Sequence, residues 1–244
     1  MNPTHNELYL ADDALDAFDK DFRDWQKYSK TIGSAIATKS VKKILDVGGG
    51  NGRFVDKLLK LYPKAQACVL DYADTMLEKN RLDARKTTQQ GTATQLDTLF
   101  IGQKFDLITI NMLLHHLVGD NEPTTRNNVL ASLVCARKIL APEGRVVVYE
   151  QVYNGSILSI EPGKIIYRLT QIRAPWISRL LKKFGANTAG VGVRFRSVQE
   201  WQDLFDEAGY ALESHSWILP DQPSLLRRTV LNIKQVGSYV FVLK

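Results

Sequence analysis

Short apolar runs alternate with longer amphipathic segments between residues 41 and 151, and this alternation predicts an α/β fold. The predicted strands cover 43–47, 65–70, 86–91, 105–111 and 145–151. The predicted helices cover 52–61, 75–81 and 125–140. Apolar strands separated by helices are typical of a doubly wound, mostly parallel sheet covered on both faces. Such sheets bind ligands at the carboxyl ends of their strands.

The pattern changes at both ends of this region. Apolar residues at three- and four-residue intervals predict a helical cap before residue 41, and a basic helical insertion follows the fifth strand. Ser197 and Glu200 match the capping box of a further helix that ends near Gly209. Strands at 210–219 and 238–243 would complete a seven-stranded sheet. We therefore expect one domain, 1–244, divided into a helical N-terminal cap (1–40), a core (41–150), a basic cap insertion (151–196) and a last helix with an antiparallel strand pair (197–244).

The first predicted strand runs into an acid and a glycine-rich turn, Asp46-Val47-Gly48-Gly49-Gly50-Asn51-Gly52. Spaced glycines permit a tight strand-to-helix turn and close approach of the backbone to a ligand. The spacing differs from the dinucleotide fingerprint G-x-G-x-x-G, whose third glycine is replaced here by Arg53. Asp71 ends the second strand nineteen residues after Gly52, close to the separation of about 20 expected for an acid that binds a ribose.

With these motifs, the chain resembles the class I S-adenosylmethionine (SAM)-dependent methyltransferases, which have a Rossmann-like fold. The resemblance covers roughly 41–150 and 195–244. It implies a SAM site in which Asp71 holds the ribose, Tyr72 lies beside the adenine and Asn111 borders the methionine. The implied cofactor residues are Asp46, Gly48, Gly49, Gly50, Gly52, Asp71, Tyr72, Thr92, Ala93 and Asn111. Thr92 stands where the family often has an adenine-binding Asp.

Candidate reactive groups follow the fourth and fifth strands. The segment Asn111-Met112-Leu113-Leu114-His115-His116-Leu117 lacks the Asn/Asp-Pro-Pro-aromatic turn of methyltransferases that act on nucleic-acid bases, and it is similar to small-molecule enzymes of the class. His115, His116 or Glu150 could accept a proton. Adjacent residues on a helix point about 100° apart, so we expect only one histidine to face a ligand. A packed histidine and an ion-paired acid are the alternatives.

Positive charge is concentrated in the insertion. The net charge is +6, and 164–196 contains eight Lys and Arg residues and no acid. Arg173, Arg194 and Arg196 are candidates for binding an anionic acceptor, and Trp25 and Tyr28 for an N-terminal lid. A solvated helix face explains the charge equally well. An anionic membrane is a further possibility, and RNA is disfavoured because the aromatic residues follow the apolar stripe.

The apolar runs, the N-terminal residues and the cysteines further restrict the class of protein. No apolar run approaches about 18 residues and the N-terminus has no signal-peptide pattern, so a cytoplasmic protein is expected. Two isolated cysteines indicate neither a disulfide nor a metal site. We predict a SAM-dependent transfer of a methyl group to an oxygen or nitrogen of a small, anionic molecule, with no metal. A non-methylating SAM-fold enzyme, an RNA or lipid methyltransferase and a SAM-binding regulatory subunit are the alternatives, and oligomeric state is left open.

Overall fold

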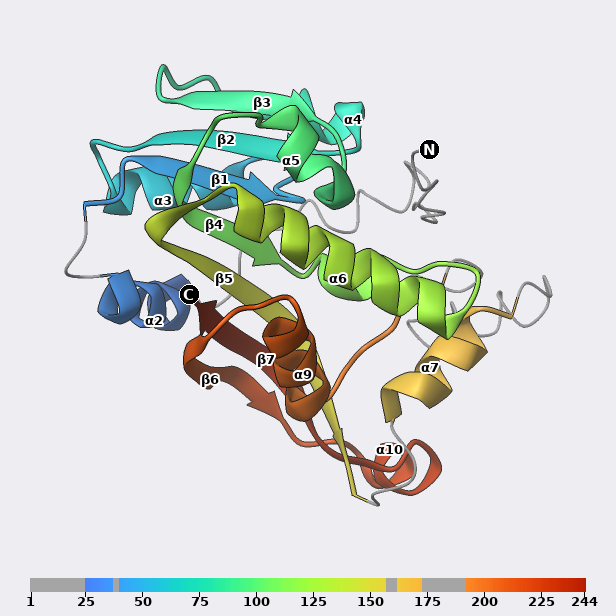
Figure 1. Ribbon diagram of the computed structural model, residues 1–244. Coiled ribbons are helices and arrows are strands. Elements are labelled where there is room, and N and C mark those ends of the chain that lie inside the picture. Colours follow the sequence, from blue (N-terminus) through green and yellow to red (C-terminus); the bar gives the residue numbers. More distant parts are fainter. Residues whose placement is uncertain (1–24, 37–39, 157–161, 173–191) are drawn as a thin grey trace.

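The computed structural model describes residues 25–36, 40–156, 162–172 and 192–244. A seven-stranded sheet in the order β3-β2-β1-β4-β5-β7-β6 runs through the molecule (Figure 1). Strands β1 to β5 are parallel, and β7 is antiparallel to both β5 and β6. The strands are β1 (Lys43–Val47), β2 (Gln66–Asp71), β3 (Lys86–Gln90), β4 (Phe105–Asn111), β5 (Leu140–Gly155), β6 (Leu212–Asp221) and β7 (Ile233–Leu243). The predicted Rossmann-like α/β fold is confirmed.

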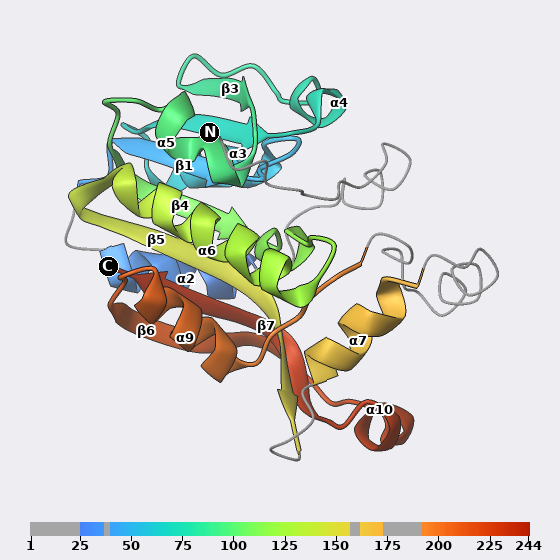
Figure 2. The ribbon, with the colours of Figure 1, turned by 45° about the vertical axis from the view of Figure 1, so that its right-hand side comes forward.

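Helices cover both faces of the sheet (Figures 1 and 2). The described helices are α2 (Trp25–Ile36), α3 (Arg53–Leu61), α4 (Asp74–Leu77), α5 (Leu96–Leu99), α6 (Glu122–Lys138), α7 (Pro162–Thr170), α9 (Val198–Glu207) and α10 (Leu225–Val230), with short 3-10 turns η2 (Ala93–Gln95) and η3 (Leu114–His116). One core layer joins α5, α6 and α9 to the sheet through residues such as Leu45. The other joins α2 and α3 through residues such as Ile44. Neighbouring strand residues therefore serve opposite layers.

Several predicted element boundaries differ from the structure, and two of the differences have identifiable reasons. Strand β5 continues to Gly155 instead of ending at 151, because it forms a long antiparallel ladder with β7. Glu150 consequently lies inside a strand and not at its end. The helix predicted over 75–81 ends at Leu77, because the side-chain amide of Asn80 donates to the Leu77 carbonyl at 3.0 Å.

The predicted caps fall partly on residues that the structure describes. Helix α2 confirms helical structure over 25–36. Residues 1–24 and 37–39 of the predicted N-terminal cap, and 157–161 and 173–191 of the predicted insertion, lie outside the described residues. Helix α9 begins with the predicted capping box of Ser197 and Glu200. None of the described helices is both long and apolar enough to cross a membrane.

Candidate functional site

The glycine turn joins β1 to α3 at the carboxyl edge of the sheet. Gly48, Gly50 and Gly52 have φ values of 71°, 52° and 69°, a region that L side chains disfavour. Gly49 is required for space instead, because a Cβ there would lie 2.5 Å from Oδ2 of Asp46. A Cβ on Gly50 would press against the Met76 methyl group at 3.2 Å and lie 3.9 Å from Asp71. The turn therefore needs glycines, and a ligand can approach a backbone without Cβ atoms closely.

Asp71 borders that space and is bound to the turn. Its carboxylate accepts hydrogen bonds from the backbone N–H groups of Gly50 at 2.9 Å and Ala73 at 3.0 Å. Burial raises the pKa of Asp71, and the backbone N–H groups of Ala73, Gly50 and Tyr72 oppose the rise. A carboxylate has about four acceptor sites, so Asp71 can still accept from a ribose hydroxyl. The open cradle and the carboxylate beside it fit the nucleoside part of SAM.

A buried chain of hydrogen bonds crosses from β1 to α2. Oδ1 of Asp46 accepts from Oγ1 of Thr109 at 2.7 Å and from the amide of Asn111 at 3.2 Å. Oδ1 of Asn111 in turn accepts from the hydroxyl of Tyr28 at 2.9 Å. Burial raises the pKa of Asp46 to about 7, with the charge of Asp71 adding to the rise and the two side-chain hydrogen bonds opposing it.

The structure thus brings three predicted residues, Asp46, Asn111 and Tyr28, into one connected group. Tyr28 is fully buried, and its ring lies 5.4 Å from that of Phe54. Trp25 is partly buried and stacks on Tyr28 at 6.4 Å between ring centroids. The predicted lid residues therefore belong to the core beside the cofactor turn.

The predicted adenine-side residues lie at the ends of β2 and β3. Tyr72 is half-buried and contacts the small cluster formed by Ala73 and Met76. The N–H of Thr92 donates to the side chain of Gln95 at 3.2 Å, and Ala93 is buried in the first turn of η2. Their roles in binding SAM stay predictions.

His115 and Glu150 form a buried pair. His115 lies in η3, after β4, and Glu150 lies within β5. One carboxylate oxygen of Glu150 accepts from the backbone N–H of Leu114 at 2.7 Å, and the other is hydrogen-bonded to Nδ1 of His115. Both side chains are buried, with exposures of 0% for Glu150 and 5% for His115. A carboxylate at Nδ1 orients an imidazole and leaves Nε2 for a second partner. The pair therefore has the arrangement of a general base and the residue that orients it.

The two histidines do not diverge as expected for a helix. They lie in the 3-10 turn η3, with their ring centroids 4.1 Å apart and their planes inclined by 42°. Burial, together with the nearby His115, holds the pKa of His116 well below its usual range, so His116 is neutral at pH 7. The geometry distinguishes His115, which is held by a carboxylate, from His116.

Comparison with known proteins agrees with this site. Residues 45–146 match the family model of a methyltransferase domain, and they include the glycine turn, Asp71, Asn111 and His115. These residues are less than half of the chain, and together with the fold they support a class I SAM-dependent methyltransferase.

Curated relatives match only part of the chain. It is 34% identical over 122 residues to the ubiquinone/menaquinone biosynthesis C-methyltransferase UbiE of Dinoroseobacter shibae, covering 47% of this chain and 44% of the relative. It is 33% identical over 110 residues to a malonyl-[acyl-carrier protein] O-methyltransferase of Legionella pneumophila, covering 41% and 39%. The matches thus span less than half the length of these relatives.

Solved structures share the fold over more of the chain. The mitomycin 7-O-methyltransferase MmcR superposes with a TM-score of 0.54 at 16% identity, over 89% of this chain and 56% of that chain. CalO1, a methyltransferase in calicheamicin biosynthesis solved with S-adenosylhomocysteine (SAH), gives 0.53 at 18% identity, over 95% and 58%.

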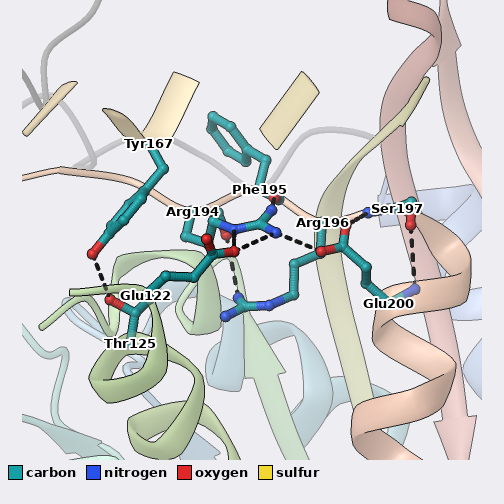
Figure 3. A network of polar contacts seen from close by, with 8 residues as sticks. All are labelled: Glu122, Thr125, Tyr167, Arg194, Phe195, Arg196, Ser197 and Glu200. Atoms are coloured by element: carbon teal, nitrogen blue, oxygen red, sulfur yellow. Dashed lines mark hydrogen bonds and ion pairs between the residues drawn. The ribbon is translucent and has the colours of Figure 1, made fainter. Parts of the chain in front are cut away.

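Two of the three candidate acceptor-binding arginines, Arg194 and Arg196, are among the described residues, and Arg173 is outside them. Arg194 and Arg196 are buried, and Phe195 between them packs its ring 5.0 Å from that of His115. Figure 3 shows the Phe195 ring and the Arg196 guanidinium on opposite sides of this extended segment. The predicted anion-binding role of these residues stays a prediction.

Sequence reasoning missed residues that complete the site. The amide of Asn80 donates to the Gly50 carbonyl at 2.8 Å and supports the glycine turn from behind. Tyr153 and Phe195 stack at 4.6 Å beside His115. Neither contact can be predicted from the sequence, because each joins residues that are far apart in the chain. Within the described ranges, no group of three or more His, Cys, Asp or Glu side chains could hold a metal ion.

Proposed function

We propose that this chain transfers the methyl group of SAM to an oxygen or nitrogen of a small molecule. The observation that carries the proposal is the placement of two groups at the carboxyl edge of one sheet. Asp71 and the glycine turn form a nucleoside cradle, and the His115–Glu150 pair forms a candidate base. An acceptor that lies between SAM in this cradle and the His115–Glu150 pair would be placed for methyl transfer.

SAM would supply an activated methyl group, and the residues of the chain would orient the acceptor, exclude water and remove its proton. Glu150 holds Nδ1 of His115, so Nε2 is the atom that would take a proton from the acceptor. A hydroxyl acceptor needs this step most, since its oxygen is a weak nucleophile until the proton leaves. Oxygen acceptors are therefore the first class to test. The relatives named above methylate carbon or oxygen according to their names.

The proposed acceptor is small and anionic. The positive charge of 164–196 supports this class, because Arg and Lys bind carboxylate and phosphate groups. Phe195 and Tyr153 supply a partly exposed aromatic surface next to His115, against which an acceptor ring can stack.

Calorimetric titration with SAH tests the cofactor site. The unmodified chain should bind SAH, and Asp71→Asn should weaken binding about tenfold or more, because the amide replaces a charged acceptor. Asp106→Asn is the matched control. Asp106 also accepts two backbone N–H groups, from Lys42 at 2.8 Å and Lys43 at 2.9 Å, but it lies at the start of β4, whereas Asp71 lies at the end of β2. Equal affinities in both variants would exclude the proposed cradle.

Turnover tests the reaction. Incubation with SAM and a panel of phenols, hydroxy acids and amines should yield SAH and a methylated acceptor in equal amounts. A chain that binds SAM but leaves it unconsumed across the panel would support the non-methylating alternatives. A steep decrease of acceptor binding with salt would instead indicate RNA.

A further inference from the structure

A half-open cavity of about 230 Å³ lies between α6, α7 and α9. Acidic and basic side chains of the three helices line it, together with Arg194 and Arg196 from the segment before α9. Figure 3 shows the Arg196 guanidinium, which lines this cavity, on the side of the segment opposite the Phe195 ring. The Phe195 ring in turn contacts His115.

The carboxylates next to Arg194 are already engaged. Oε1 of Glu122 accepts from Nε and Nη2 of Arg194 at 3.2 and 3.1 Å. Glu200 forms an ion pair with the same guanidinium, and its other oxygen accepts from the backbone N–H of Ser197 at 2.9 Å, which closes the cap of α9. Arg194 thus neutralises charge that lines the cavity.

Arg196 differs from Arg194 in its partners. Its side chain is buried, with 4% exposure, and one N–H group at Nη1 donates to the Arg194 carbonyl at 3.3 Å. No ion pair joins it to any carboxylate among the described residues, which leaves four of the five guanidinium N–H groups available. Burial and, to a smaller extent, the charge of Arg194 lower the pKa of Arg196 to about 10, although nearby carboxylates such as Glu200 oppose the decrease. A buried cation with unused donors is costly unless an acceptor is supplied.

Carboxylates lie near Arg196, but among the described residues none of them accepts a hydrogen bond from its guanidinium. The guanidinium makes a cation–π contact with Trp201, 5.0 Å from the ring centroid. The indole N–H of Trp201 is buried and has no hydrogen-bond partner among the residues that the structure describes. Lys164 adds a further positive charge to the cavity lining.

We propose that this cavity binds a small oxyanion, a phosphate or carboxylate group, through the guanidinium of Arg196. A planar guanidinium pairs with such a group by two parallel hydrogen bonds, and the cavity has room for the ion with several waters. The group is either a free ion or the anionic end of the acceptor. The second source rests on the proposed function, whereas binding of the ion itself does not.

The segment also links this cavity to the candidate base. The Arg194 N–H donates to the His115 carbonyl at 3.0 Å, and the Arg196 carbonyl accepts from the Tyr153 N–H at 3.1 Å. A bound oxyanion would therefore stabilise the segment that places Phe195 against His115.

Titration of the chain with inorganic phosphate at constant ionic strength tests the proposal. Phosphate should bind saturably and raise the melting temperature, whereas chloride should not. Arg196→Gln should weaken phosphate binding about tenfold or more, because a charged bidentate partner is lost. Arg145→Gln is the matched control, since Arg145 has the same 4% exposure but is already paired with Glu213. The control should lose stability and keep its affinity for phosphate.

The absence of saturable phosphate binding to the unmodified chain would overturn the proposal, and this result does not depend on whether any variant folds. Equal affinity in Arg196→Gln and the unmodified chain would also overturn it. If phosphate raises the KM of a carboxylate-bearing acceptor but not of its neutral analogue, the site takes the acceptor's own group. If neither KM changes, the site takes a free ion. Failure of turnover alone would refute the proposed reaction and leave the phosphate result intact.

Discussion

Replacing Asp46 by Asn isolates the energetic effect of a buried carboxylate beside the cofactor turn. Asp46 is 1% exposed, and burial raises its pKa from 3.8 to about 7. Between these values the folded chain keeps a proton that the unfolded chain has lost, so the free energy of unfolding decreases as the pH rises through this window and levels off above it. The shift of about 3 units corresponds to about 4 kcal/mol, at about 1.4 kcal/mol per unit.

The variant should preserve the local hydrogen bonds. An Asn oxygen can accept from Thr109 and Asn111 as Oδ1 of Asp46 does. Urea unfolding without ligand at pH 5 and pH 8 then gives two stability differences between Asp46→Asn and the unmodified chain. From pH 5 to pH 8 the unmodified chain should lose about 3 kcal/mol of unfolding free energy relative to Asp46→Asn. This loss comes from the two pH units between 5 and the pKa of about 7. An identical difference at both pH values would refute the reasoning.

Three further changes test separate parts of the site. Glu150→Gln should lower kcat for SAH formation about 100-fold and leave the KM for SAM unchanged, because His115 loses the carboxylate that orients it; full activity would remove the pair from the mechanism. Gly49→Ala should lower the free energy of unfolding by about 1–3 kcal/mol, since the new Cβ lies 2.5 Å from a carboxylate oxygen. Gly33→Ala on α2 is its control, with nothing within 4 Å, and should raise stability by about 0.5–1 kcal/mol.

The sequence predicted those parts of the fold that depend on local pattern. Strand β4 has the predicted bounds, and the capping box of Ser197 and Glu200 begins α9 as expected. The glycine turn was recognisable because its backbone needs residues without a Cβ, which leaves a direct record in the sequence. Asp71 followed from the fixed length of a β-α-β unit.

The parts that the sequence did not predict depend on contacts between distant segments. The length of β5 is set by its ladder with β7, and the early end of α4 by a side chain that also holds Gly50. The pairing of His115 with Glu150 joins residues 35 positions apart. Charge counting over 164–196 likewise could not show that Arg194 is neutralised by acids on α6 and α9.

The hydrogen bond from the N–H of Val193 to Oγ1 of Thr170, at 3.1 Å, has a practical consequence for protein engineering. It joins the end of α7 to the segment before α9, on the two sides of residues 173–191. The α7 side is itself fixed, since the hydroxyl of Tyr167 lies 3.0 Å from Oγ1 of Thr125. Peptides of different length could therefore be spliced between these points at little cost in loop-closure entropy, which makes this position a natural junction for chimeras that alter acceptor choice.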